Sequence, residues 1–209
     1  MRSEHLTVFV IDDDASVRDS IALMLGLAGY RTAVFADAEA FLAAWKEDWA
    51  GCVIADVRLP GQSGVQLQDE LRKRAITLPF VIITAHGDVP TARAAFRLQA
   101  VDFLEKPFDH VQLCAAIETA FALEERRTQR QDSRRADTEK LDRLTSRERE
   151  VLEHAARGLH AKEIAIALGI SPRTVEVHKT RIMEKLDVRN VAELVRFAIA
   201  ATPSDGDSS

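Results

Sequence analysis

The sequence has only two cysteines, Cys52 and Cys114, and neither lies in a CxxC motif. This excludes a disulfide framework and fits a reducing compartment. No stretch approaches the roughly 18 consecutive apolar residues of a membrane span. The polar start MRSEHL leads into an apolar run that is too short for the hydrophobic region of a signal peptide. We therefore expect a cytoplasmic protein without a membrane partner.

Aromatic residues are also scarce, at 6% of the chain, and positive charge is in short supply. The formal net charge is -5, with an acidic front half and a mildly basic segment after residue 142. Such a small excess of basic residues does not by itself indicate nucleic-acid binding. No basic stretch is interleaved with aromatics, which argues against single-strand binding. Any case for duplex DNA must come from the helix pattern.

What the front of the chain does have is five short, β-branched apolar runs separated by segments of helical period. The runs do not alternate with polar residues, which predicts strands buried on both faces, as in a parallel sheet covered by helices. Five strands alternating with five helices predict a doubly wound α/β domain over residues 1–123. The five runs are TVFVI from residue 7, RTAVF from 31, CVIA from 52, PFVIIT from 79 and AVDFL from 100.

Residues 124–142 form a charged segment in which residues 124–140 hold no apolar side chain except Ala136. The segment cannot contribute to a core, but it lacks Gly and Pro and is rich in residues that favour helix. We predict a helical linker that continues the preceding helix, with disorder as the alternative.

The pattern changes again over residues 143–201, where only helical periods remain and a small all-α domain of four helices is expected. Thr145 and Glu148 form a capping box, Gly158 and Gly169 end helices, and Ser171 caps the next one. A short helix, a turn and a basic helix over 172–187 match the helix-turn-helix plan. The fourth helix carries Val191, Leu194, Val195 and Ala198, and residues 202–209 are expected to be disordered.

Several polar side chains follow the predicted strands. Asp12 and Asp13 follow the first, Asp56 the third, Thr84 ends the fourth, and Lys106 follows the fifth. The carboxyl ends of parallel strands meet at one edge, where ligands bind in open α/β sheets. Clustered carboxylates need a compensating cation, and a hard ion such as Mg²⁺ suits them. Each motif alone is ordinary, but together they predict a cation and phosphate site.

Two local features support this edge. Asp14, followed by Ala15 and Ser16, is suited to cap the first helix rather than to bind a ligand. Gly61 and Gly64 would let the loop after Asp56 bend close to the site.

The motifs DDD, D-x-R-L-P-G, T-A and K-P, spread over residues 6–123, resemble the receiver domain of bacterial two-component response regulators, which has a flavodoxin-like sheet. The resemblance implies that a sensor histidine kinase phosphorylates Asp56. It implies that Mg²⁺ is held by Asp12, Asp13, Asp56 and the backbone carbonyl of Arg58. It further implies that Thr84 and Lys106 contact the phosphoryl group, that Phe103 turns inward on activation, and that the Lys106–Pro107 peptide bond is cis.

The pattern LTSREREVL…GLHAKEIAIALGISPRTVEVHKTRIMEKLDV is similar to the effector domain of the LuxR/NarL family over residues 143–200. The implied recognition helix suits duplex DNA, with basic residues on phosphates, Val177 on a thymine methyl and Thr180 on a base edge. Glu176 departs from the Lys that is common at this position in some relatives, and it either reads cytosine N4 or repels a phosphate. The expected DNA contacts, all predicted to face outward, are Lys162, Arg173, Thr174, Glu176, Val177, Lys179, Thr180 and Arg181.

As a whole the chain resembles a response regulator of the FixJ type, which is a regulator and not an enzyme. This implies dimerisation through Val89, Pro90, Arg93 and residues near Asp102, then binding to promoter DNA, with RNA polymerase as a further candidate partner. Two alternatives remain open. One is a transcription factor that works without phosphorylation. The other is a Mg²⁺-dependent phosphohydrolase with Asp12 and Asp14 as nucleophile and acid.

Overall fold

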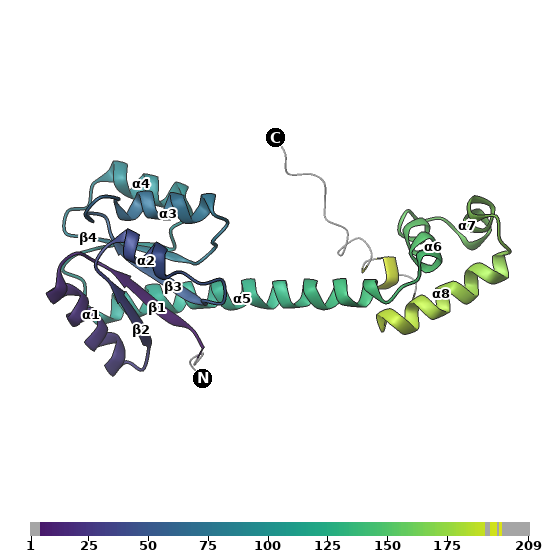
Figure 1. The fold of residues 1–209 in the computed structure, drawn as a ribbon, viewed down its shortest axis with the longest axis horizontal. Coiled ribbons are helices and arrows are strands. Elements are labelled where there is room, and N and C mark those ends of the chain that lie inside the picture. Colours follow the sequence, from purple (N-terminus) through teal and green to yellow (C-terminus); the bar gives the residue numbers. More distant parts are fainter. Residues whose placement is uncertain (1–4, 191–192, 196, 198–209) are drawn as a thin grey trace. The chain divides into compact units, whose positions relative to one another are not determined.

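The computed structural model describes residues 5–190, 193–195 and 197. The chain divides into two compact units, and the division falls between Arg127 and Thr128. The first unit is built on a parallel sheet of five strands in the order β2-β1-β3-β4-β5 (Figure 1). The strands are β1 (Thr7–Ile11), β2 (Arg31–Phe35), β3 (Gly51–Asp56), β4 (Phe80–Thr84) and β5 (Asp102–Glu105).

The three central strands are the buried ones. β3 and β4 are buried along their whole length, and β1 is buried from Val8 onward. β2 and β5 lie at the two edges of the sheet and are only partly covered. The prediction that all five strands are buried on both faces is therefore wrong for the edge strands, which lack a neighbour on one side.

Helices cover both faces of this sheet (Figure 1). α1 (Ala15–Leu27) and the start of α5 (His110–Asp142) pack on one face through Ile21, Leu25, Leu113 and Ile117. On the other face, Phe41, Leu67, Leu71 and Ala95 form the core. They come from α2 (Ala38–Ala44), α3 (Gly64–Lys73) and α4 (Val89–Arg97). The two cores fix the strands in register, so that their carboxyl ends form one rigid edge.

The segment predicted as a helical linker is part of α5, which is one helix from His110 to Asp142. The segment's first residue, Glu124, belongs to no apolar cluster but is fully buried, which the charge of the segment did not indicate. Both Glu124 carboxylate oxygens accept hydrogen bonds from the Arg127 guanidinium at 2.6 and 2.8 Å, and Arg127 also donates to the Thr77 hydroxyl. This pairing offsets the cost of burying the carboxylate.

The second unit contains α6 (Ser146–Ala156), α7 (Ala161–Leu168) and α8 (Pro172–Leu186) around a core that includes Val151, Ile164, Val175 and Ile182. The capping box of Thr145 and Glu148 and the Ser171 cap form as predicted. Gly169 ends α7 in the left-handed conformation at φ 65°.

Of the predicted fourth helix, residues 193–195 and 197 are helical and Leu194 is buried. Residues 191, 192, 196 and 198, like the predicted disordered tail 202–209, lie outside the described residues. Across the part of the chain that the structure describes, no helix combines the length and the apolar character that crossing a bilayer demands.

Candidate functional site

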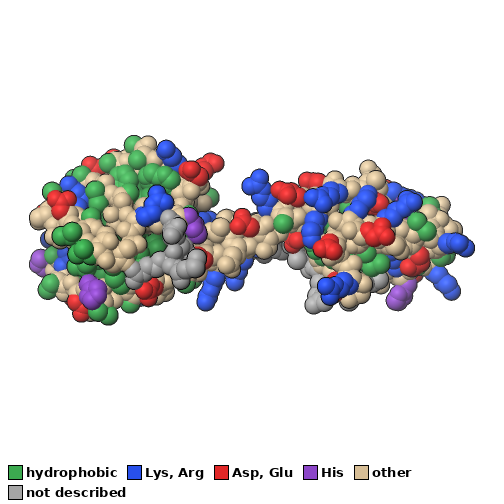
Figure 2. All heavy atoms as spheres, turned by 90° about the horizontal axis from the view of Figure 1, so that it is seen from below, with side chains coloured by type: hydrophobic (Ala, Val, Ile, Leu, Met, Phe, Trp, Pro, Cys, Tyr) green, Lys and Arg blue, Asp and Glu red, His purple; other side chains and the backbone are tan. Residues whose placement is uncertain are grey.

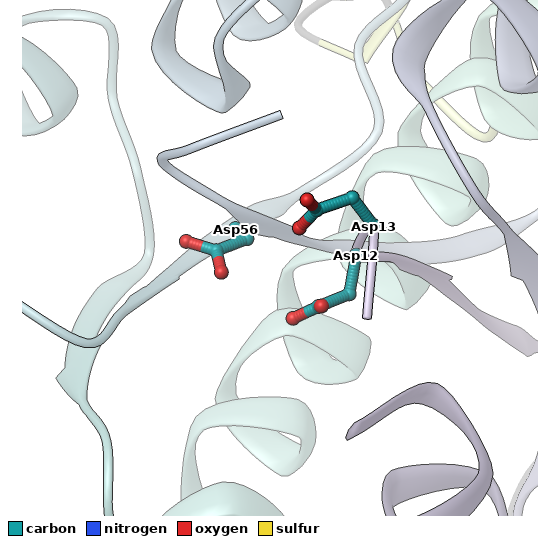
Figure 3. A group of neighbouring side chains, drawn as sticks. All are labelled: Asp12, Asp13 and Asp56. Carbon is teal, nitrogen blue, oxygen red and sulfur yellow. The ribbon is translucent and has the colours of Figure 1, made fainter. Parts of the chain in front are cut away.

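Three carboxylates meet at the carboxyl edge of the sheet (Figure 3). Asp12 and Asp13 follow β1, and Asp56 is the last residue of β3. A ligand oxygen from each lies within 4.8 Å of the other two, which is a spacing that one cation can bridge. Asp12 is fully buried and Asp56 is 7% exposed, while Asp13 is open to solvent. The residues present therefore fit a hard divalent ion with access from one side.

Lys106 already supplies one positive charge to this cluster. Its ammonium lies 2.6 Å from Asp12 Oδ2 and 2.6 Å from Asp56 Oδ2. Burial acts to lower the pKa of Lys106, but hydrogen bonds and charge interactions with the two carboxylates outweigh it and raise the pKa. Lys106 is therefore a fixed cation in the site. The peptide bond between Lys106 and Pro107 is cis, as expected.

Backbone groups hold the remaining carboxylate oxygens. The amide of Asp14 donates to Asp12 Oδ1 at 2.9 Å, and the amide of Arg58 donates to Asp56 Oδ1 at 3.1 Å. The loop after Asp56 must pass close to it, because a Cβ on Gly64 would lie 2.3 Å from the Asp56 carbonyl oxygen. Only glycine fits there, which agrees with the role predicted for Gly64.

Asp14 does not belong to the cluster. Its carboxylate caps α1, accepting hydrogen bonds from the amide and the hydroxyl of Ser16 at 2.8 and 2.6 Å. These bonds, the hydroxyl first, lower the pKa of Asp14. The capping role predicted for Asp14 is confirmed, and its carboxylate is directed to the helix rather than to Asp56.

Thr84 is buried at the end of β4, but its hydroxyl is engaged by its own loop. The hydroxyl donates to the His86 carbonyl oxygen and accepts from the His86 amide, both at 3.2 Å. Phe103 on β5 packs against the core on the α2–α4 face of the sheet. A Cβ on Gly87 would lie 3.3 Å from the Phe103 ring, so this loop lies against the ring.

Sequence reasoning missed Glu105, the last residue of β5, whose carboxylate accepts a hydrogen bond from the Gly87 amide at 3.3 Å. Thr84 and Glu105 are direct partners in the sheet register, which places both beside the loop that begins after Thr84. The position of Glu105, directly before Lys106, was the only signal available in the sequence.

In the second unit, α8 presents a polar outward side and α7 presents Lys162. Figure 2 shows basic and acidic side chains side by side on the visible face of this unit. One residue departs from the predicted outward set: Lys179 is buried, at 8% exposure, next to the core residues of α8. It lies three to four positions from Val175 and Ile182, on the inward side of the helix. The exposed members of the set are Lys162, Arg173, Thr174, Glu176, Val177, Thr180 and Arg181.

Known proteins share both units. Residues 8–118 match the family model described as response regulator receiver domain, and residues 142–198 match that of the bacterial regulatory proteins, luxR family. The transcriptional regulatory protein FixJ of Azorhizobium caulinodans is 41% identical over 206 residues, covering 99% of this chain and 98% of that protein. FixJ of Bradyrhizobium diazoefficiens is 42% identical over 194 residues, covering 93% and 95%.

Two solved structures are similar over most of the chain as well. The response regulator StyR aligns with a TM-score of 0.82 and 40% identity, covering 93% of this chain and 98% of that one. Full-length FixJ from B. japonicum aligns with a TM-score of 0.59 and 41% identity, covering 95% and 98%. The chain therefore belongs to the FixJ-type response regulators, in which a receiver domain is joined to a LuxR-family DNA-binding domain.

Proposed function

We propose that the receiver, residues 1–123, accepts a phosphoryl group on Asp56 from a sensor histidine kinase. The effector domain, residues 143–201, then binds promoter DNA, and residues 124–142 link the two. The observation that carries this proposal is the contact of one ammonium, that of Lys106, with two buried carboxylates at the edge of the sheet. Promoter DNA lies in the bacterial cytoplasm, and we place the protein there.

In the transfer, a carboxylate oxygen of Asp56 forms a bond to phosphorus while the phosphorus–nitrogen bond of the kinase phosphohistidine breaks and the imidazole leaves. Lys106 stays protonated and offsets the charge that develops on the phosphoryl oxygens. Asp12, Asp13, Asp56 and the backbone carbonyl of Arg58 would hold Mg²⁺. When bound, that ion neutralises part of the charge on the phosphoryl oxygens.

Phosphorylation gives the Thr84 hydroxyl a better acceptor than the His86 carbonyl oxygen that it now contacts. Thr84 then turns to the phosphoryl oxygen, the loop moves with it, and Phe103 follows inward. The surface of α4 and β5 changes as a result. This surface carries the exposed apolar residues Val89 and Phe96 on α4, which supports its use in a dimer.

A dimer brings two copies of α8 to neighbouring half-sites of the operator. The outward residues of α8 and Lys162 of α7 then contact DNA, and RNA polymerase is a further candidate partner at the promoter. The protein acts in this scheme as a regulator rather than as an enzyme. Use of the Asp14 carboxylate as a helix cap argues against the phosphohydrolase alternative, which requires it as an acid.

The test is gel filtration and fluorescence anisotropy with a promoter fragment, before and after addition of beryllofluoride with Mg²⁺. We expect dimerisation and tighter DNA binding in the native protein and neither change in Asp56→Asn. Equal affinity in both conditions for the native protein would instead favour a transcription factor that works without phosphorylation.

A further inference from the structure

The recognition helix contains a buried lysine. Lys179 is 8% exposed, and lysine is almost never buried to this extent without a partner for its charge. The ammonium lies 3.4 Å from Glu176 Oε1, one turn earlier on the same helix. The two side chains differ sharply in exposure, at 10% for Lys179 and 62% for Glu176. The buried ammonium of Lys179 is thus paired with the exposed carboxylate of Glu176.

Glu176 is well placed to meet DNA. It is the fifth residue of α8, in the N-terminal half of the helix, which is the part that contacts base edges in helix-turn-helix proteins. Val177 and Thr180 are exposed close to it on the same side of the helix. These three residues form a short outward surface, with basic Arg173 and Arg181 nearby for phosphates.

An isolated carboxylate would be repelled by the phosphates of a duplex. The ammonium of Lys179, 3.4 Å from Oε1, offsets part of that charge. Among the residues that the structure describes, none donates a hydrogen bond to Glu176 Oε2, so one acceptor oxygen remains available to a ligand.

A carboxylate can only accept hydrogen bonds, so it selects a donor in the major groove. The cytosine amino group is such a donor, whereas the adenine amino group lies beside the N7 acceptor, which repels a carboxylate. We propose that Glu176 reads the N4 amino group of a cytosine in each operator half-site, and that Lys179 is the positioning residue that holds its carboxylate for this contact. The inference rests on the proposed DNA-binding function and deepens it.

The test is selection of binding sites from a library of random DNA duplexes with the full-length protein, activated by beryllofluoride and Mg²⁺. The native protein should select a cytosine at one position of each half-site. Glu176→Gln should replace it by adenine, because an amide offers a donor and an acceptor together, with a change in relative preference of about five- to tenfold. The other positions should not change. Glu176 is exposed, so this substitution leaves the core intact.

Lys179→Met and Lys179→Arg test the positioning role. Methionine keeps the bulk without the charge and should weaken the cytosine preference. Arginine keeps the charge and should preserve the preference. If Glu176→Gln selects the same bases as the native protein, or only binds all sequences more tightly, the reading role is wrong. If Lys179→Met keeps the full preference, the positioning role is wrong. A native protein that selects no motif would overturn the proposed DNA-binding function itself.

Discussion

Lys106→Met removes the ammonium that contacts two buried carboxylates, those of Asp12 and Asp56. Oxygens of these groups lie within 4.8 Å of each other, so their repulsion at an effective dielectric constant of about 20 is about 3 kcal/mol. Removing one partner of a buried ion pair destabilises a protein by a similar amount. We therefore expect the free energy of unfolding of the receiver to fall by about 3 kcal/mol in the absence of Mg²⁺.

Mg²⁺ should recover part of this loss, because it replaces the missing cation. At ten times its dissociation constant, a ligand that binds only the folded state contributes about 1.4 kcal/mol. The recovery should be larger in Lys106→Met than in the native protein, since the carboxylates of the variant have no other cation. Asp13→Asn alters an exposed ligand. Mg²⁺ should stabilise this variant less than it stabilises the native protein, whereas the stability without Mg²⁺ should change little.

Urea unfolding followed by tryptophan fluorescence measures these changes, because both tryptophans, Trp45 and Trp49, lie in the first unit. The matched control is Lys73→Met, which removes a surface lysine paired with Asp69, and should change stability by less than about 0.5 kcal/mol. If Lys106→Met is as stable as this control without Mg²⁺, the argument from buried carboxylates is refuted.

Three further predictions concern other parts of the chain. Burial acts to raise the pKa of Glu148, but hydrogen bonds from its lysine and threonine partners outweigh it and lower the pKa from 4.5 to about 2. The resulting stabilisation, roughly 1–2 kcal/mol because the lysine is partly exposed, is complete above about pH 4.5 and is lost as the pH falls towards 2. The stability of the second unit, followed by far-UV circular dichroism, should depend less on pH in Glu148→Gln than in the exposed control Glu150→Gln. Gly64→Ala places a Cβ 2.3 Å from a backbone oxygen of the site and should slow phosphorylation by acetyl phosphate about tenfold or more, whereas Gly26→Ala, with nothing within 4 Å, should leave the rate unchanged. Glu105→Ala frees the loop amide that it holds at 3.3 Å and should raise the affinity for beryllofluoride about fivefold, while Glu105→Gln keeps an acceptor and should resemble the native protein; equal affinity in all three would contradict a restraining role.

Much of the fold follows from local pattern. The runs at 7–11 and 31–35 coincide with β1 and β2, because apolar β-branched segments flanked by turn residues have few alternatives to a strand. The caps at Asp14, Thr145 and Ser171 form for equally local reasons, since each side chain needs only an amide two or three residues ahead.

What could not be predicted depends on partners that are distant in the sequence or on small rotations. The buried carboxylate of Glu124 pairs with Arg127, which also donates to Thr77, 50 residues away in the sequence. Lys179 lies four residues after Val175 and three before Ile182, so helical spacing places it on the inward side of α8, but its charge favoured the outward assignment. The strand-end rule predicts that Asp12, Asp56 and Lys106 converge. It does not give the direction of a hydroxyl such as that of Thr84, which turns to its own loop.

The most direct test of the central claim is intact-mass spectrometry after incubation with acetyl phosphate and Mg²⁺. The native chain should gain one phosphoryl group, Asp14→Asn should gain it as well, and Asp56→Asn should gain none. A phosphoryl group that persists on Asp56→Asn would contradict the account, because the Asp56 carboxylate that contacts Lys106 would then not be the acceptor.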